Sequence, residues 1–167
     1  RAIKLMASVY LGLGSNISPD INLSIAIREL EARYGELKRS AVYRGAAVGF
    51  DGADFLNLVV SLQSNQTPLD ICGEIELIHN LAGRVREGNK WGSRPLDIDL
   101  LLYDDLVSDE RPVRVPRDDI LQYSFVLRPI AELAPALLHP LTGKTVLEHW
   151  QNFDSKSQPL EKVNVDW

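Results

Sequence analysis

The order of strand-like and helix-like segments is the feature that most constrains how this chain can fold. Apolar residues alternate with polar ones, or cluster, in four strand-like segments and recur at helical spacing in two others. In chain order, the expected elements are a strand at 8–16, a helix from Pro19 to Gly35, strands at 40–45 and 55–64, a helix from Pro68 to Gly83 and a strand at 96–103. This order is the split βαβ pattern, which predicts an α+β, ferredoxin-like (βαββαβ) antiparallel sheet.

Both expected helices carry sequence signals at their ends. Ser18 can cap the first helix and Thr67 opens the second, each followed directly by a proline. Gly35 and Gly83 stand where the helices are expected to stop. The apolar stripes expected to face the core are Leu23, Ala26, Ile27 and Leu30 in the first helix and Ile71, Ile75, Ile78 and Leu81 in the second.

The rest of the chain adds helices to this unit. Residues 123–135 and 144–153 have the pattern of additional C-terminal helices, and the tail is polar. No repeat or long linker divides the chain, so residues 6–167 are expected to form a single domain. Residues 1–5 lack the apolar region of a signal peptide and are expected to be an appended remnant outside the fold. No apolar run approaches the ~18 residues that a membrane helix needs, so we expect no membrane partner.

Charge and cysteine content limit the partners and the compartment. The formal net charge of -5 argues against a basic surface for nucleic acid. Cys72 is the only cysteine, so no internal disulfide can form, which favours a cytoplasmic location. Cys72 itself is expected to be a small core residue. No protein partner can be deduced from these features.

The strongest chemical signal is a pair of acidic residues inside an apolar strand. Side chains alternate between the faces of a strand, so Asp97 and Asp99 share one face. The expected members of that face are Asp97, Asp99 and Leu101, and those of the opposite face are Ile98, Leu100 and Leu102. Two carboxylates on Cα atoms roughly 7 Å apart repel each other unless a cation lies between them. Mg²⁺ fits, since it takes oxygen ligands and completes its shell with waters and phosphates. Salt bridges to arginines on a solvated face are the alternative.

A basic segment directly precedes the acidic pair. Residues 84–94 contain only one acid, Glu87, in a chain that is acidic overall. Its cationic residues are Arg84, Arg86, Lys90 and Arg94. Guanidinium groups match phosphate oxygens, and a glycine-containing loop lets them converge on a polyphosphate. Trp91 in the same segment either caps a ligand or folds back onto the core. Metal ligands beside arginines are the parts that phosphoryl-type transfer uses.

These residues resemble the 6-hydroxymethyl-7,8-dihydropterin pyrophosphokinase family of folate biosynthesis. The resemblance extends from Met6 to about Leu147 and follows the family's order and spacing of motifs. The motifs are GSN at 14–16, FLN at 55–57, GRVR at 83–86, WGSRPLDIDLLLYD at 91–104, VP at 115–116 and FVLRPIAELAP at 125–135.

The resemblance implies an ATP- and Mg²⁺-dependent pyrophosphokinase with a ferredoxin-like fold. Such an enzyme transfers pyrophosphate from ATP to 6-hydroxymethyl-7,8-dihydropterin and leaves AMP, so ATP and a reduced pterin are its expected ligands. Two Mg²⁺ ions would be held by Asp97 and Asp99, which would form the catalytic set with Arg84 and Arg94. The implied ATP-binding residues are Arg84, Arg86, Arg94, Leu100, Arg114 and Arg117. The implied pterin-binding residues are Gly45, Val48, Phe55, Asn57, Trp91, Asp97 and Phe125.

Three positions depart from the family's usual pattern. Arg117 follows the VP pair where histidine is usual, Tyr123 replaces an arginine, and His79 replaces a glutamate. Arg117 can bind phosphate but cannot donate a titrating proton near neutral pH. Two alternatives therefore stay open: a divergent paralogue with low activity or a related pterin substrate, and a non-catalytic ferredoxin-like binding module.

Overall fold

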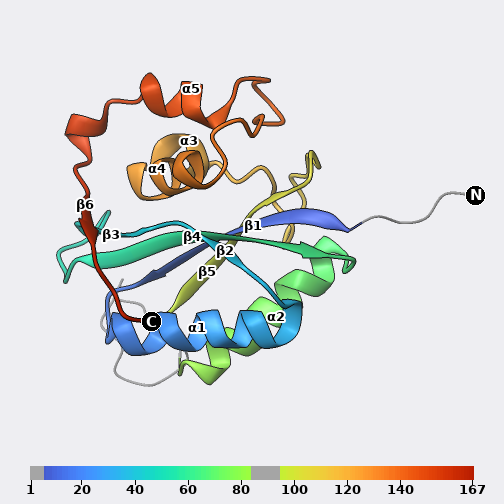
Figure 1. Ribbon diagram of the computed structural model, residues 1–167, viewed down its shortest axis with the longest axis horizontal. Coiled ribbons are helices and arrows are strands. Elements are labelled where there is room, and N and C mark those ends of the chain that lie inside the picture. The colour runs from blue at the N-terminus through green and yellow to red at the C-terminus, as the bar shows by residue number, and fades with distance from the viewer. Residues whose placement is uncertain (1–5, 84–94) are drawn as a thin grey trace, which may run out of the picture.

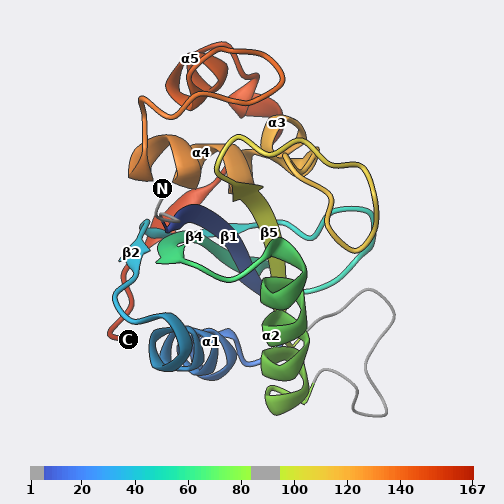
Figure 2. The same cartoon turned by 90° about the vertical axis from the view of Figure 1, so that its right-hand side faces the viewer.

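A computed structural model describes residues 6–83 and 95–167 of the chain. The described elements form three layers, with one sheet between two groups of helices (Figure 1). The first two helices of the chain cover one face of the sheet, and the later helices cover the other, as the view along the layers also shows (Figure 2). The sequence-based expectation of added C-terminal helices is confirmed by this second helical layer.

The sheet has the strand order of a ferredoxin-like fold. Its four main strands are β1 (Ala7–Ser15), β3 (Val42–Gly45), β4 (Phe55–Ser64) and β5 (Asp97–Tyr103), and they lie in the order β5-β1-β4-β3 with every pair antiparallel. This order matches the predicted βαββαβ arrangement. Two short strands were not predicted: β2 (Lys38–Arg39) pairs with β4, and β6 (Glu161–Val163) extends the sheet beyond β3.

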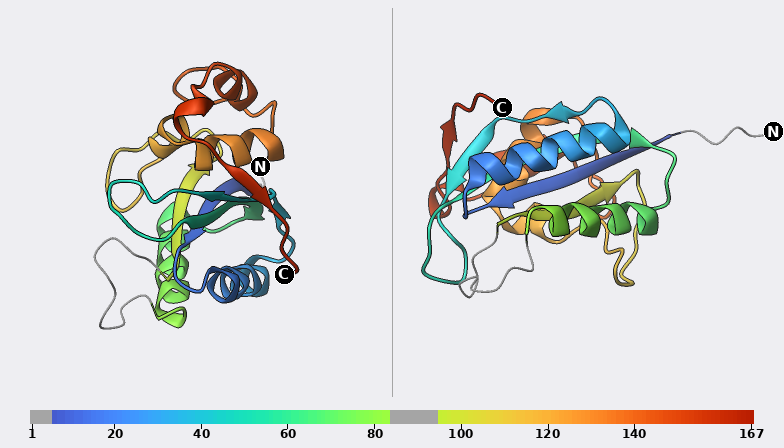
Figure 3. Two further views of the ribbon diagram at one scale, coloured as in Figure 1. Left: turned by 90° about the vertical axis from the view of Figure 1, so that its left-hand side faces the viewer. Right: turned by 90° about the horizontal axis from the view of Figure 1, so that it is seen from below.

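The first two helices lie side by side across one face of the sheet (Figure 3). They are α1 (Pro19–Tyr34) and α2 (Pro68–Leu81). The Thr67 side chain caps α2 by accepting a hydrogen bond from the backbone N–H of Asp70 at 3.1 Å, as expected. Ser18 was predicted to cap α1, and this is wrong. Its backbone is left-handed, with φ of 43°, and its side chain makes no capping bond. Neither helix, nor any other within the described residues, is long and apolar enough to cross a membrane.

The apolar stripe of α2 differs from the expected one at its last member. Ile71, Ile75 and Ile78 are buried, but Leu81 is 58% exposed. The stripe continues instead to Ala82, which is buried and lies four residues after Ile78, one helical turn further on. Both stripes contribute to the larger core cluster beneath the sheet.

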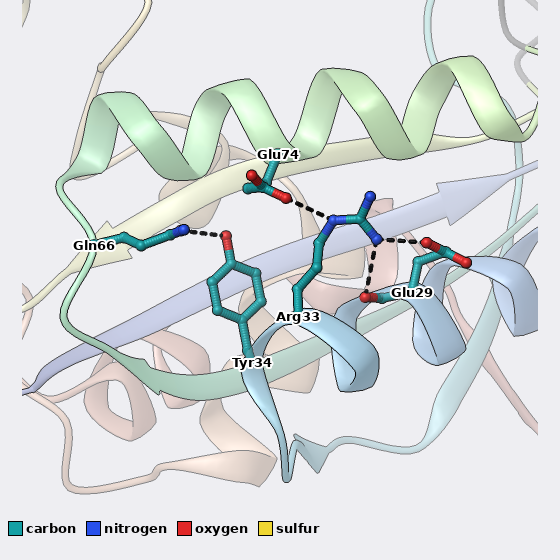
Figure 4. Close-up of polar contacts among 5 residues, drawn as sticks. All are labelled: Glu29, Arg33, Tyr34, Gln66 and Glu74. Atoms are coloured by element: carbon teal, nitrogen blue, oxygen red, sulfur yellow. Dashed lines mark hydrogen bonds and ion pairs between the residues drawn. The ribbon is translucent and has the colours of Figure 1, made fainter.

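Polar contacts hold α1 and α2 together (Figure 4). Arg33 of α1 donates from Nε to Glu74 of α2 at 2.6 Å and also pairs with Glu29 on its own helix. Tyr34 at the end of α1 donates its hydroxyl to Gln66, just before α2, at 2.7 Å. These contacts fix the position of α2, which matters because α2 borders the candidate active site.

The opposite face carries α3 (Asp119–Gln122), α4 (Ser124–Leu133) and α5 (Val146–Gln151). A short 3-10 turn at Ser155–Ser157 then leads back to β6. The predicted helices at 123–135 and 144–153 correspond to α4 and α5, while α3 was not predicted. A second core cluster forms where these helices meet Val59, Leu101 and Leu102 of the sheet.

Leu102 faces this second cluster, although strict alternation placed it on the opposite side from Leu101. The pairing of β1 with β5 explains the difference. Tyr10 pairs with Leu102, but the next residue of β1, Leu11, pairs with Leu100, so Leu101 is an extra residue on β5. This β-bulge lets two consecutive side chains share one face. The earlier part of the strand follows the prediction, since Ile98 and Leu100 belong to the lower core cluster.

Candidate active site

Two glycines inside β1 open a hollow on the sheet face that also carries the acidic pair. Gly14 is paired with Asn57 of β4 on one side and with Asp97 of β5 on the other. Gly12 stands likewise next to Asp99. A Cβ atom on Gly14 would lie 2.6 Å from Oδ1 of Asn57, so any larger residue would fill the space beside that amide. Glycine in a strand interior is typical of such a close approach.

The hollow is a cavity of about 210 Å³ between the sheet and α4. It has both apolar walls and acidic groups at its rim. The lining residues are Gly12, Leu13, Gly14, Ala46, Val48, Phe50, Phe55, Asn57, Leu58, Asp97, Asp99, Leu101, Asp119, Phe125 and Val126. We call it the first cavity. Its shape and lining suit a flat, polar-edged ring, because aromatic walls bind ring faces while carboxylate and amide groups fix the ring edge.

Aromatic contacts hold the walls of the first cavity. Phe50 meets Phe55 edge to face, with ring centroids 6.2 Å apart. At the start of α4, Tyr123 stacks on Phe125 with centroids 5.1 Å apart. Tyr123, one of the departures from the family pattern, therefore supports an aromatic wall in this chain. Phe50 was not singled out from the sequence, because nothing in its loop indicates which side chain folds inward.

Five of the seven expected pterin-binding residues line the first cavity: Val48, Phe55, Asn57, Asp97 and Phe125. Gly45 does not. It pairs with Phe55 at the end of β3, and a Cβ atom there would point at the side chain of Leu160, 2.9 Å away. Trp91 lies outside the described residues.

A second cavity, of about 500 Å³, lies on the other side of β5. It is formed by α2, β5 and the segment 112–117. The lining residues are Leu69, Cys72, Gly73, Ile75, Glu76, Ile98, Asp99, Leu100, Pro112, Arg114 and Arg117. Three expected ATP-binding residues, Leu100, Arg114 and Arg117, are therefore brought together here. Arg84, Arg86 and Arg94 lie outside the described residues.

Asp99 lines both cavities, and Asp97 lines the first. The acidic pair thus stands where two ligands would meet. Within residues 6–83 and 95–167, no cluster of three or more His, Cys, Asp or Glu side chains could hold a metal. Two carboxylates alone fit Mg²⁺, which usually takes one or two protein carboxylates and completes its octahedral shell with waters and substrate phosphates.

Arg117 lies against the acidic pair. Its Nη2 is 3.5 Å from Oδ1 of Asp99, and its Nε is 3.4 Å from Oδ2 of Asp119. Burial lowers the pKa of Arg117, but Asp99, Asp119 and Asp97 together raise it above its ordinary value. The guanidinium of Arg117 therefore stays protonated, and it lies beside Asp99, the carboxylate that both cavities share.

His79 reaches the strand between the two acidic residues. Its Nε2 accepts a hydrogen bond from the backbone N–H of Ile98 at 2.9 Å, and its Nδ1 lies 3.1 Å from Oε2 of Glu76. Since Nε2 accepts, the ring is the neutral tautomer that carries its proton on Nδ1 and donates it to Glu76. β5 is an edge strand among the residues that the structure describes, and none of their strands pairs with the outward N–H of Ile98. His79 supplies that partner from α2.

The GSN motif has a structural explanation. β1 continues through Ser15, so the first two residues of the motif belong to the strand. Ser15 is fully buried and donates its hydroxyl to the carbonyl of Pro95 at 2.5 Å, which holds the start of β5. Asn16 donates its side-chain amide to the carbonyl of Ala53 at 3.2 Å, which holds the loop over the first cavity. The three residues together position the acidic pair and one cavity wall.

The ferredoxin-like sheet thus carries an acidic pair between two cavities, a site suited to an enzyme that joins two ligands. The family model for 7,8-dihydro-6-hydroxymethylpterin-pyrophosphokinase matches residues 10–135, and the chain belongs to this family.

Known proteins agree with this assignment. The chain is 41% identical over 166 residues to the 2-amino-4-hydroxy-6-hydroxymethyldihydropteridine pyrophosphokinase of Methylorubrum extorquens, covering 95% of this chain and 99% of that protein. It is 37% identical over 145 residues to the enzyme of the same name from Aquifex aeolicus, covering 86% and 90%. The fold is similar to that of Plasmodium falciparum HPPK-DHPS, with a TM-score of 0.72 at 14% identity. That match covers 93% of this chain but only 46% of the Plasmodium chain.

Proposed function

We propose that this protein transfers the β,γ-pyrophosphoryl group of ATP to the hydroxymethyl group of 6-hydroxymethyl-7,8-dihydropterin in folate biosynthesis. The observation that carries the proposal is the position of Asp99 in the walls of both cavities, with Asp97 beside it. Two substrates bound in these cavities would meet at the carboxylates. Membership of the pyrophosphokinase family supports pyrophosphate transfer as the reaction between the two substrates. The single cysteine supports a cytoplasmic location.

We place the pterin in the first cavity. Phe55 of β4 and Phe125 of α4 both line it, and their rings would stack on the faces of the pterin ring. Asn57 is 7% exposed and presents donor and acceptor groups to the ring edge. Trp91 would close this cavity, as the family resemblance implies.

We place ATP in the second cavity. Leu100 supplies apolar surface there, and Arg114 and Arg117 supply positive charge for the phosphates. Arg84, Arg86 and Arg94 would add to this charge. Two Mg²⁺ ions would be held by Asp97 and Asp99; Mg²⁺ would neutralise the phosphate oxygens and align them for in-line transfer.

The reaction then needs positioning more than covalent chemistry from the protein. The hydroxymethyl oxygen of the pterin attacks the β-phosphorus of ATP and forms the new O–P bond. The bond from that phosphorus to the bridging oxygen of the α-phosphate breaks, AMP leaves with the electron pair of that bond, and the proton of the hydroxymethyl group passes to solvent. The walls of the first cavity fix the attacking oxygen, while arginines in the second stabilise charge developing on AMP.

Substitution of the acidic pair tests the proposal. Asp97→Asn and Asp99→Asn keep side-chain size but remove the charges that hold Mg²⁺, so AMP formation should fall by about a hundredfold or more in each. The matched control is Asp105→Asn, an exposed residue just after β5, which should retain full turnover. Circular dichroism should show all three variants folded. Retained turnover in both Asp97→Asn and Asp99→Asn would refute the metal assignment.

A further inference from the structure

The position of Arg117 allows its side chain to pair with carboxylates as well as to bind phosphate. Its backbone N–H donates to the carbonyl of Leu101 at 3.0 Å, which holds the residue directly beside β5. From there the side chain reaches two carboxylates, Asp99 at 3.5 Å and Asp119 at 3.4 Å. Arg117 also lines the second cavity, where we place ATP. One guanidinium can therefore serve either a carboxylate or a phosphate.

The contacts of Arg117 with the carboxylates are electrostatic and not well-formed hydrogen bonds. A charge-assisted N–H···O bond is typically about 2.7–2.9 Å long, and both contacts exceed that distance. The Nε atom is buried and forms no hydrogen bond of good geometry. A buried donor without a hydrogen bond is stabilised when a phosphate oxygen comes close enough to accept one from it. The ion pairs thus neutralise Asp99 without locking the guanidinium in place.

We propose that Arg117 couples metal binding to nucleotide binding. Without nucleotide, its guanidinium supplies the positive charge beside Asp99 that Mg²⁺ supplies in the loaded site. When Mg²⁺ and ATP arrive together, Arg117 moves from the carboxylate to a phosphate oxygen and no longer competes with the metal for Asp99. This inference rests on the proposed metal site at Asp97 and Asp99.

The exchange has a thermodynamic consequence that can be measured. Free Mg²⁺ must compete with Arg117 for Asp99, so the metal alone binds weakly. ATP removes the competitor, so the metal binds more tightly in its presence, and by linkage the metal tightens ATP by the same factor. A residue that only binds phosphate would affect nucleotide affinity alone. Arg117 should affect the two affinities in opposite directions.

The test measures Mn²⁺ binding by electron paramagnetic resonance, with and without an ATP analogue that has a methylene bridge between the α- and β-phosphorus atoms. Arg117→Gln should bind Mn²⁺ alone about twofold to fivefold more tightly than the wild type, the range for removing a partly exposed ion pair. The same variant should bind the Mn²⁺–nucleotide complex more weakly. Arg117→Lys keeps the charge and should leave the affinity for Mn²⁺ alone close to the wild-type value.

Arg114→Gln is the matched control. It removes the same charge from the same cavity, but Arg114 pairs with Asp109 at 3.5 Å. Arg114→Gln should weaken binding of the Mn²⁺–nucleotide complex without tightening the binding of Mn²⁺ alone. Unchanged or weaker binding of Mn²⁺ alone in Arg117→Gln, or equal tightening in Arg114→Gln, would overturn the coupling. If instead the wild type binds no Mn²⁺ even with nucleotide, or Asp99→Asn binds it equally well, the metal site of the proposed function is wrong.

Discussion

Replacement of His79 by leucine tests how the acidic pair is held in place. His79 is 2% exposed, and Ile98, whose backbone N–H it accepts, is 3% exposed. Leucine has a similar size but no acceptor, so the N–H of Ile98 would be left buried and unsatisfied. The residues on either side of Ile98 are Asp97 and Asp99, so a shift of the backbone there would move both proposed metal ligands.

The magnitude follows from the cost of a buried donor without a partner, which is about 1–3 kcal/mol. For a domain of this size, each kcal/mol lowers the melting temperature by roughly 2–4 °C, so about 2 kcal/mol corresponds to roughly 4–8 °C. The effect on metal binding should be of similar size to the effect on the fold. Loss of a group that orients metal ligands typically costs about 10- to 100-fold in metal affinity, so we expect at least about a tenfold higher Mg²⁺ requirement for AMP formation.

Urea unfolding and a Mg²⁺ titration of AMP formation measure the two effects. His79→Gln restores an acceptor and should recover most of both losses. His149→Leu is the control. His149 forms a hydrogen bond with the exposed Thr142 and meets the ring of the buried His139 edge to face. Its replacement should cost less than about 0.5 kcal/mol. The reasoning fails if His79→Leu is no more destabilised than His149→Leu, or if its Mg²⁺ requirement is that of the wild type.

Two further predictions concern the cavities. Gly14→Ala places a Cβ atom 2.6 Å from Oδ1 of Asn57 and should weaken binding of 6-hydroxymethylpterin by about tenfold or more in calorimetry, whereas Gly73→Ala, where a Cβ atom meets nothing within 4 Å, should not. Equal affinity in wild type and Gly14→Ala would place the pterin elsewhere. Cys72 lines the second cavity, so the Mg²⁺ complex of a non-hydrolysable ATP analogue should slow its modification by a maleimide, and the pterin alone should not. An unchanged labelling rate would argue against ATP in that cavity.

The sequence predicted the parts of the fold that depend on local chemistry. The helix ends at Thr67 and Gly35 follow from capping and glycine preferences, and the four main strands follow from their apolar patterns. β6 could not be predicted, because a three-residue polar strand depends on pairing with β3, which lies more than a hundred residues earlier. Leu102 was placed on the wrong face because a bulge depends on the partner strand as well as on its own sequence.

The sequence likewise predicted only those parts of the candidate site that depend on local patterns. Alternation along one strand was sufficient to place Asp97 and Asp99 together. The role of Gly12 and Gly14 could not be predicted, because it depends on the register of β1 with both neighbouring strands. A strand-interior glycine was the available signal. His79 was identified from the sequence only as a departure from the family pattern, because its link to Ile98 depends on the packing of α2 against β5.

The bulge at Leu101 divides β5 into two segments. The side chains of the second segment alternate between the faces of the sheet one residue out of step with those of the first. The first segment directs its acidic side chains to the cavities and its apolar side chains to the lower core, whereas the second directs Leu102 to the upper core. An insertion or deletion of one residue before the bulge would rotate Asp97 and Asp99 away from the cavities, while the segment after it could keep its pairing. Length changes in this strand should therefore be tolerated far less well than substitutions of its apolar residues.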